Sequence, residues 1–142
     1  MTDYNTDYYA WTNEQAQLLR TGQLHEIDLD HIIEELETMG RSEKRALESR
    51  IIVLLTHLLK WQYQPVRRGK SWELTIKGQR ANCSDVLSDN PSLKSKLDEL
   101  FVRAYNRSRI EAAKETGLDE NHFPEQCPYT ISQVFDNSFL PK

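Results

Sequence analysis

The segment from Ile51 to Leu59 most constrains the fold, because it is the only long stretch that is apolar on nearly every side of a helix. It reads Ile-Ile-Val-Leu-Leu-Thr-His-Leu-Leu. A helix that is apolar all round is enclosed by partners rather than laid on a surface. We therefore predict a buried central helix from Ser42 to Pro65, which ends there because the residue before a proline is pushed out of the helical region.

Two amphipathic helices are predicted before the central one. The first begins at a cap provided by Thr6 or Asp7, whose side chain accepts hydrogen bonds from free N–H groups, and stops at Gly22. The second, capped by Asp28 or Asp30, ends at Gly40, where we expect a break or a sharp kink, because glycine inside a helix costs about 1 kcal/mol relative to alanine. Its apolar residues form one stripe: Leu29, Ile32, Ile33, Leu36 and Met39.

Two further helices and a tail follow the central helix. Ser71 caps a helix that runs to about residue 88, and the pair Asn90-Pro91 starts another that Gly117 stops. After it the helical periodicity fades, and prolines and aromatic residues predict a tail laid across the bundle, with one short helix capped by Thr130. No convincing pair of strands and no internal repeat are present.

The predicted fold class is therefore all-α. It is a helical bundle of four main helices plus a short helix and an extended aromatic C-terminal tail. A chain of 142 residues is long enough to bury a sizeable core without disulfide or metal staples. We expect residues 1–142 to form a single domain.

Charge is distributed unevenly along a chain whose formal net charge is −4. Residues 60–80 carry six basic and one acidic group, whereas residues 1–50 carry five and eleven. The N-terminus lacks the basic start and apolar run of a secretory signal, and the longest apolar run is too short to span a bilayer. Cys83 and Cys127 match no zinc or redox spacing. We expect a cytoplasmic protein with no membrane contact and no cofactor.

An acidic group of residues on the second predicted helix is a candidate metal site. His31 lies three and four residues before Glu34 and Glu35, so imidazole and carboxylate could share a cation. Di-iron bundles, however, need Glu-x-x-His on two helices, and this chain has the reverse order once. A solvated acidic face is the other interpretation. The corresponding alternative function is a metal-assisted hydrolase or oxidase that uses Glu34, Glu35, Glu37 and His57.

His57 lies inside the central helix, where its helical neighbours are apolar. A buried imidazole needs a hydrogen-bond partner for at least one nitrogen, because an unsatisfied one costs on the order of 1–3 kcal/mol. We expect that partner to be a carboxylate or hydroxyl on another helix. Two interpretations stay open: a core histidine with its hydrogen bond made, or a general base or ligand.

Cations and aromatic rings are interleaved between residues 60 and 80. The candidate binding residues are Trp61, Tyr63, Arg67, Arg68, Lys70, Trp72, Lys77 and Arg80. Cations that contact phosphates and rings that stack on bases are typical of single-stranded nucleic-acid binding. The acidic chain, with an isoelectric point near 5.6, argues against a dedicated nucleic-acid protein. Arginines that pair with the acidic first two helices, or a contact surface for an acidic protein, explain the same residues.

Short motifs spread over nearly the whole chain carry a family resemblance. They are Asp7-Tyr8-Tyr9-Ala10-Trp11, Glu14-Gln15-Ala16, Leu18-Leu19-Arg20, Glu34-Glu35-Leu36-Glu37, Met39-Gly40-Arg41-Ser42-Glu43, His57-Leu58-Leu59-Lys60-Trp61-Gln62-Tyr63-Gln64-Pro65, Ser71-Trp72, Thr75-Ile76, Gln79-Arg80, Asn90-Pro91-Ser92-Leu93, Glu115-Thr116-Gly117-Leu118, Phe123-Pro124 and Cys127-Pro128-Tyr129-Thr130. With them the chain resembles the bacterial family called domain of unknown function twenty-nine, frequent in cyanobacteria. The resemblance implies an all-α fold and no activity, so no catalytic residue is carried over. It marks as family-typical polar positions Glu34, Glu35, Glu37, Arg41, Glu43, His57, Gln64, Arg80 and Arg109.

These observations favour a non-enzymatic binding module. The chain has no phosphate-cradling glycine loop, nucleophile elbow, dinucleotide fingerprint or Cys/His triad. Sites assembled across helices leave little trace in a sequence, so the metal-assisted enzyme stays an alternative. We predict binding of another macromolecule through residues 60–80. The partner we favour is a protein, self-association is possible, and single-stranded nucleic acid is the rival partner.

Overall fold

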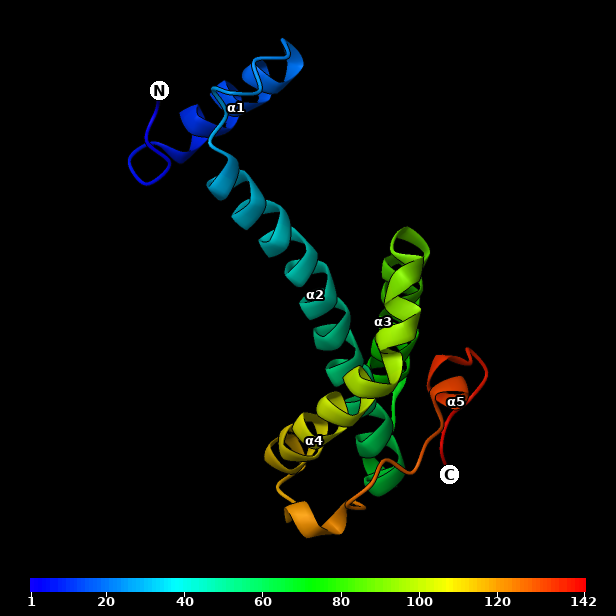
Figure 1. Ribbon diagram of the computed structural model, residues 1–142. Coiled ribbons are helices and arrows are strands. Elements are labelled where there is room, and N and C mark those ends of the chain that lie inside the picture. Colours follow the sequence, from blue (N-terminus) through cyan, green and yellow to red (C-terminus); the bar gives the residue numbers. More distant parts are fainter. The chain divides into compact units, whose positions relative to one another are not determined.

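Helices are the only regular elements of the protein, whose computed structural model describes all 142 residues. The α-helices are α1 (Tyr8–Arg20), α2 (Leu29–Tyr63), α3 (Lys70–Asp89), α4 (Leu97–Thr116) and α5 (Ile131–Phe135), labelled in Figure 1. Three short 3-10 turns separate some of them: η1 (Pro65–Arg67), η2 (Pro91–Lys96) and η3 (Glu120–His122). The predicted all-α fold with four main helices and one short helix is confirmed.

The chain divides into two compact units, Met1–Ser42 and Glu43–Lys142. The first unit contains α1 and the beginning of α2. The second contains the rest of α2 together with α3, α4 and α5. The expectation of a single domain over residues 1–142 stays a prediction. None of the helices combines the length and the apolar character that crossing a bilayer requires.

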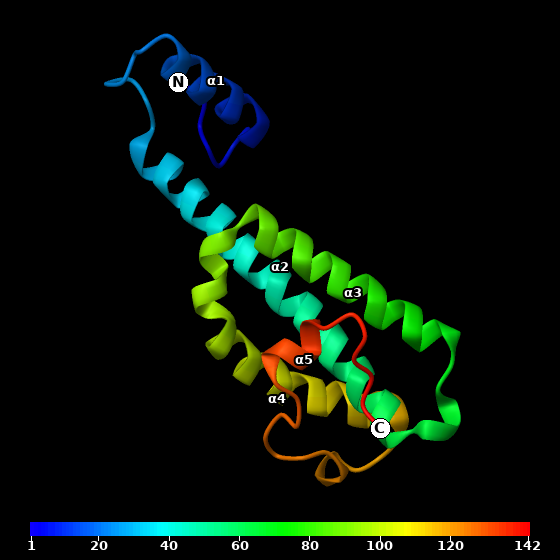
Figure 2. The same ribbon diagram turned by 90° about the vertical axis from the view of Figure 1, so that its right-hand side faces the viewer.

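The core of the second unit is built around residues 51–59 of α2. Five of their side chains have no exposed surface: Ile51, Leu54, Leu55, Leu58 and Leu59. Ile76 of α3, Leu100 of α4 and Val134 of α5 belong to the same apolar cluster. Both views show α3 beside this half of α2 (Figure 2). Full burial of each leucine contributes about 1.5–3 kcal/mol, so this cluster holds the unit together.

The predicted break at Gly40 is wrong, because α2 runs without interruption from Leu29 to Tyr63. A Cβ atom added at Gly40 would meet nothing within 4 Å, and its φ is not positive. The glycine penalty of about 1 kcal/mol is offset by strong helix formers on both sides. Arg41 and Glu37 also form an i,i+4 ion pair across the site at 3.7 Å. Ser42 is therefore inside a helix and caps nothing.

Other helix ends follow the sequence signals to different degrees. Thr130 caps α5 through a complete capping box with Gln133, as predicted. Gly117 ends α4 with φ of +76°, a conformation that glycine adopts without a Cβ clash. Residues 91–96 form a 3-10 turn, so α4 begins only at Leu97. Likewise α3 begins at Lys70, with no side-chain cap, rather than after Ser71.

Candidate functional site

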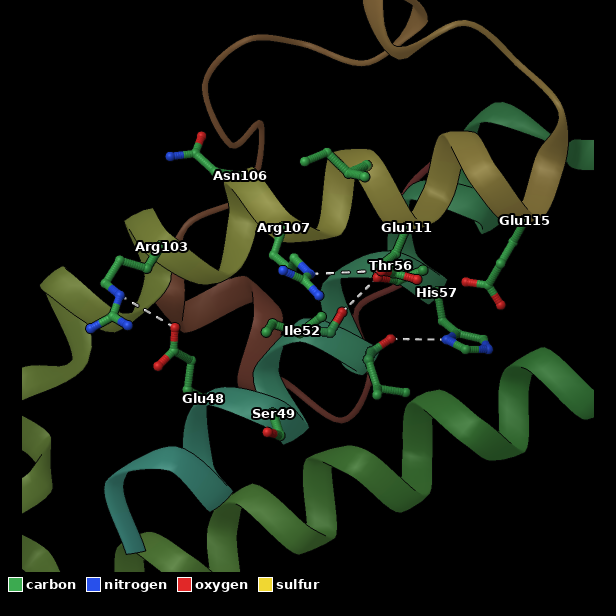
Figure 3. Close-up of a pocket in the computed structure, with 12 residues that line it drawn as sticks. Glu48, Ser49, Ile52, Thr56, His57, Arg103, Asn106, Arg107, Glu111 and Glu115 are labelled. Carbon is green, nitrogen blue, oxygen red and sulfur yellow. Dashed lines mark hydrogen bonds and ion pairs between the residues drawn. The ribbon is translucent and has the colours of Figure 1, made fainter. Parts of the chain in front are cut away.

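A groove of about 800 Å³ lies between α2 and α4 in the second unit. Its apolar surface comes from Ile52 and Val53 of α2 and Ile110 of α4. Figure 3 shows these helices side by side, with the polar residues of both around the groove. The Ser108 hydroxyl of α4 lies 2.7 Å from the carbonyl oxygen of Ala104 on its own helix and 3.1 Å from that of Ile52 on α2, so it marks where the two helices touch. The groove therefore runs along the contact between α2 and α4.

Every charged side chain that lines the groove is in an ion pair. Arg103 of α4 lies 3.4 Å from Glu48 of α2, and Arg107 lies 3.7 Å from Glu111 on its own helix (Figure 3). Glu115 lies 3.5 Å from the ammonium group of Lys60. Surface ion pairs of this kind contribute about 0–1 kcal/mol each. Because the charges compensate locally, the groove has no strong preference for an anion or a cation.

His57 lines this groove and is half-buried. Its Nδ1 lies 2.9 Å from the carbonyl oxygen of Val53, one turn earlier in α2. The expectation of a carboxylate or hydroxyl partner on another helix is therefore wrong, because the helix supplies the acceptor itself. Burial lowers the pKa of His57. The imidazole is thus held neutral, with Nδ1 as donor and the lone pair on Nε2.

No three or more His, Cys, Asp and Glu side chains come together in a way that could hold a metal ion. Of the four candidate ligands, Glu35 accepts hydrogen bonds from the hydroxyl groups of Tyr4 and Tyr8, the second at 2.6 Å. Glu34 and Glu37 are exposed to solvent, as expected for an acidic helix face. Nothing in the arrangement of the donor groups supports the metal-assisted alternative.

A cluster of aromatic and acidic side chains ties together the elements of the first unit. The Asp28 carboxylate accepts from the indole N–H of Trp11 at 3.0 Å and pairs with Nδ1 of His31 at 2.7 Å. The ring of Tyr4 stacks on that of His31, with centroids 4.2 Å apart. Gln15 accepts from the backbone N–H of Asp28 at 2.7 Å. These contacts fix the loop before α2 against α1, which is a structural role.

The His31–Asp28 pair makes a testable prediction about pH. Its hydrogen bond with Asp28 raises the pKa of His31 above the ordinary histidine value of 6.5. The stabilisation from this raised pKa is fully present below the unfolded value and is lost as pH rises through the folded value. We expect the NMR titration midpoint of His31 to lie above 6.5, and Asp28→Asn to lower it while keeping an acceptor for Trp11. An unchanged midpoint in Asp28→Asn would contradict the pairing.

Two of the predicted binding residues have a structural role instead. Arg80 is only 4% exposed, and it donates from Nε to the carbonyl of Val134 at 2.8 Å and from Nη2 to that of Phe139 at 2.7 Å. Arg68 donates to the carbonyl of Trp61 at 2.6 Å and to the main chain of Lys142 at 3.0 Å. Both guanidinium groups therefore hold the C-terminal segment in place.

The aromatic residues of the predicted set are half-buried and have contacts of their own. The guanidinium carbon of Arg68 lies 5.3 Å from the centroid of the Trp61 ring. The ammonium nitrogen of Lys60 lies 4.8 Å from the centroid of the Trp72 ring. Tyr63 packs edge-to-face on Phe123 at 5.3 Å. Base stacking needs an open ring face. Each ring already has a protein group against it, which makes the set poorly suited to stacking.

Three cations of the predicted set are exposed. Arg67 lies in η1, and Lys70 and Lys77 lie in α3, and none of them forms an ion pair. Two apolar side chains accompany them: Val66 is 93% exposed and Leu74 is 54% exposed. Together these five residues form a surface that we call the basic ridge. The assignment of binding to this segment stays a prediction.

Sequence reasoning missed the groove and the exposure of one apolar stripe. Leu29, Ile33 and Leu36 of α2 are 56%, 43% and 61% exposed, although their spacing predicted one apolar helix face. Spacing shows that residues share a face and not whether another element covers it. The sequence contained only a weak sign of the groove. The central helix is apolar on all sides, but part of its surface faces polar residues of α4 such as Arg103 and Arg107.

Comparison with known proteins identifies one family. The model of the family described as "Domain of unknown function DUF29" matches residues 4–140, which is nearly the whole chain and includes parts of both units. No curated protein and no solved structure matches the chain. The predicted family resemblance is therefore confirmed.

Proposed function

Because the chain belongs to the DUF29 family, whose name assigns no activity, we propose its function from its own surfaces: it is a binding module for an acidic surface of another protein. The contact surface is the basic ridge. The observation that carries the proposal is that Arg67, Lys70 and Lys77 are exposed and form no ion pair, in a chain with net charge −4. Uncompensated charge of one sign steers a partner of the opposite sign.

The arrangement of the basic ridge suits a helical or extended acidic segment. Lys70, Leu74 and Lys77 follow one another at i, i+4 and i+7, so they share one face of α3. Val66 and Arg67 lie in the turn just before that helix. Leu74, exposed between the two lysines, provides an apolar contact beside the charges, and polar groups around an apolar contact are typical of the rim of a protein interface.

A protein partner fits this surface better than single-stranded nucleic acid does. Nucleic-acid grooves combine cations with rings that stack on successive bases. Here Trp61 and Trp72 have cations against their rings, and Tyr63 packs on Phe123. Arg67, Lys70 and Lys77 are exposed, whereas the three rings are half-buried and each already has a protein group against it, so acidic side chains are the better counterpart.

Fluorescence anisotropy tests the proposal on the full chain. The probe is a fluorescein-labelled peptide in which glutamates alternate with leucines, with a glutamine-for-glutamate version as the control peptide. We expect binding to the acidic peptide that weakens as salt increases. The triple variant Arg67→Glu, Lys70→Glu, Lys77→Glu is expected to bind at least about tenfold more weakly, because it reverses every charge in the contact.

A matched variant distinguishes the effect of the basic ridge on binding from the effect of net charge. Lys94→Glu, Lys96→Glu, Lys114→Glu makes the same change in net charge at exposed lysines that also form no ion pair. We expect it to bind the acidic peptide within about twofold of the wild type, since these lysines lie outside the contact. Equal losses of peptide affinity in both triple variants would mean that net charge, and not the basic ridge, determines binding. Absence of peptide binding, or tight salt-dependent binding of oligothymidine instead, would overturn the proposal of a protein partner.

A further inference from the structure

The first unit presents an apolar face of α2 that nothing in that unit covers. Leu29, Ile33 and Leu36 follow one another at i, i+4 and i+7, and Gly40 continues the same row at i+11. The first three are about half exposed or more. Asp28, His31 and Glu35, which bind the N-terminal segment and α1, lie on another side of the helix. This apolar stripe therefore points away from the cluster that holds its own unit together.

We propose that a second copy of this chain covers the apolar stripe, with the two copies of α2 antiparallel. The charges beside the stripe support this occupant. At 100° per residue, one flank of the stripe carries three acidic residues followed by a basic one toward the C-terminal end: Asp30, Glu34, Glu37 and Arg41. Antiparallel pairing places this flank of one copy against the same flank of the other, with Arg41 of each copy opposite Asp30 of its partner, whereas parallel pairing would bring the flank against the other side of the stripe.

The side chains of the stripe are complementary to themselves in this arrangement. A two-fold axis near the middle of the row places Ile33 of one copy beside Leu36 of the other, at both symmetry-related positions. The same axis places Leu29 opposite Gly40. A Cβ atom at Gly40 would meet nothing within 4 Å, so the surface there is open and can receive a leucine. Gly40, which does not interrupt α2, would thus provide the space that receives Leu29 of the other copy.

The contact is small, so the dimer is expected to be weak. The row from Leu29 to Gly40 is about 16 Å long, at a rise of 1.5 Å per residue. Three large apolar side chains per copy bury much less than the surface of a standard stable interface. We expect a dissociation constant on the order of 10⁻⁵–10⁻⁴ M, and a dimer that forms when the protein is concentrated or tethered.

Sedimentation equilibrium of the full chain tests the proposal through charge-swapped variants. Asp30→Arg and Arg41→Asp each place like charges opposite one another in an antiparallel homodimer. We expect each variant alone to associate at least about tenfold more weakly than the wild type. An equimolar mixture of the two variants restores opposite charges at both positions. We expect the mixture to regain dimer formation to within about threefold of the wild type.

Further variants keep the test decisive. Leu36→Ala is expected to weaken association at least about tenfold, and Lys114→Asp on α4 is a charge-change control expected to leave it unchanged. Circular dichroism checks that Asp30→Arg retains its helix. Recovery of the dimer in the mixture of the two variants cannot arise from fraying of the helix end, because fraying would weaken association in the mixture as well. A wild type that stays monomeric up to about 1 mM would overturn the proposal. So would a dimer insensitive to Leu36→Ala, or a mixture that associates no better than the single variants.

Discussion

Replacing Leu58 with alanine is expected to lower the free energy of unfolding by about 2–5 kcal/mol. Leu58 has no exposed surface and belongs to the core cluster of the second unit. The change removes three buried carbon atoms and leaves a cavity that helices on several sides cannot close completely. Since natural domains are stable by only about 5–15 kcal/mol, the loss is a large part of the total. Urea denaturation followed by circular dichroism measures it.

Leu36→Ala provides a matched control on the same helix. It removes the same atoms from a side chain that is 61% exposed, so the free energy of unfolding should change by about 0.5 kcal/mol or less. The comparison is made at low protein concentration, where the proposed dimer does not contribute. A loss below about 1 kcal/mol for Leu58→Ala would mean that residues 51–59 are not enclosed as described.

Replacing Arg80 with methionine is expected to cost about 2–4 kcal/mol and to release the C-terminal tail. The buried guanidinium donates to the carbonyl groups of Val134 and Phe139, and both hydrogen bonds come from a charged group. Methionine keeps most of the volume but leaves both carbonyls without a donor. Denaturation gives the energy, and limited proteolysis reports release through faster cleavage after Phe135.

Two further variants interpret the Arg80 result. Lys77→Met makes the same kind of change on the exposed side of α3 and should alter stability by no more than about 0.5 kcal/mol. Arg80→Lys keeps the charge but lacks the planar fork that reaches two carbonyls, so it should lie between the wild type and Arg80→Met. A tail that is equally protected in Arg80→Met would contradict the role assigned to this residue.

Much of the fold could be predicted because its signals are local. The run of apolar residues at 51–59 is too long and too uniform to lie on a surface, and it forms the core. Thr130 with Gln133, and Gly117, mark helix ends through chemistry that acts within one turn. Gly40 failed as a signal because its cost of about 1 kcal/mol is small beside the helix propensity of its neighbours.

The site could be predicted only in part, because burial depends on residues distant in the sequence. Arg67 and Arg80 have the same chemistry and lie in the same basic segment, but one is exposed and the other is buried beneath the tail. The carbonyls that bind Arg80 lie 54 and 59 residues further along the chain. For the same reason the sequence could not tell that His57 bonds to its own helix, or that Leu36 is uncovered.

The two halves of α2 therefore have different roles, and hydrogen exchange along this helix tests that division most directly. We expect the amides of residues 51–59 to exchange only through global unfolding, at a rate independent of protein concentration. The amides of residues 29–39 are expected to exchange faster in dilute protein and to slow as the concentration rises and the stripe is covered. Equally fast exchange in both segments, independent of protein concentration, would contradict both the burial of residues 51–59 and the proposed pairing of the apolar stripe.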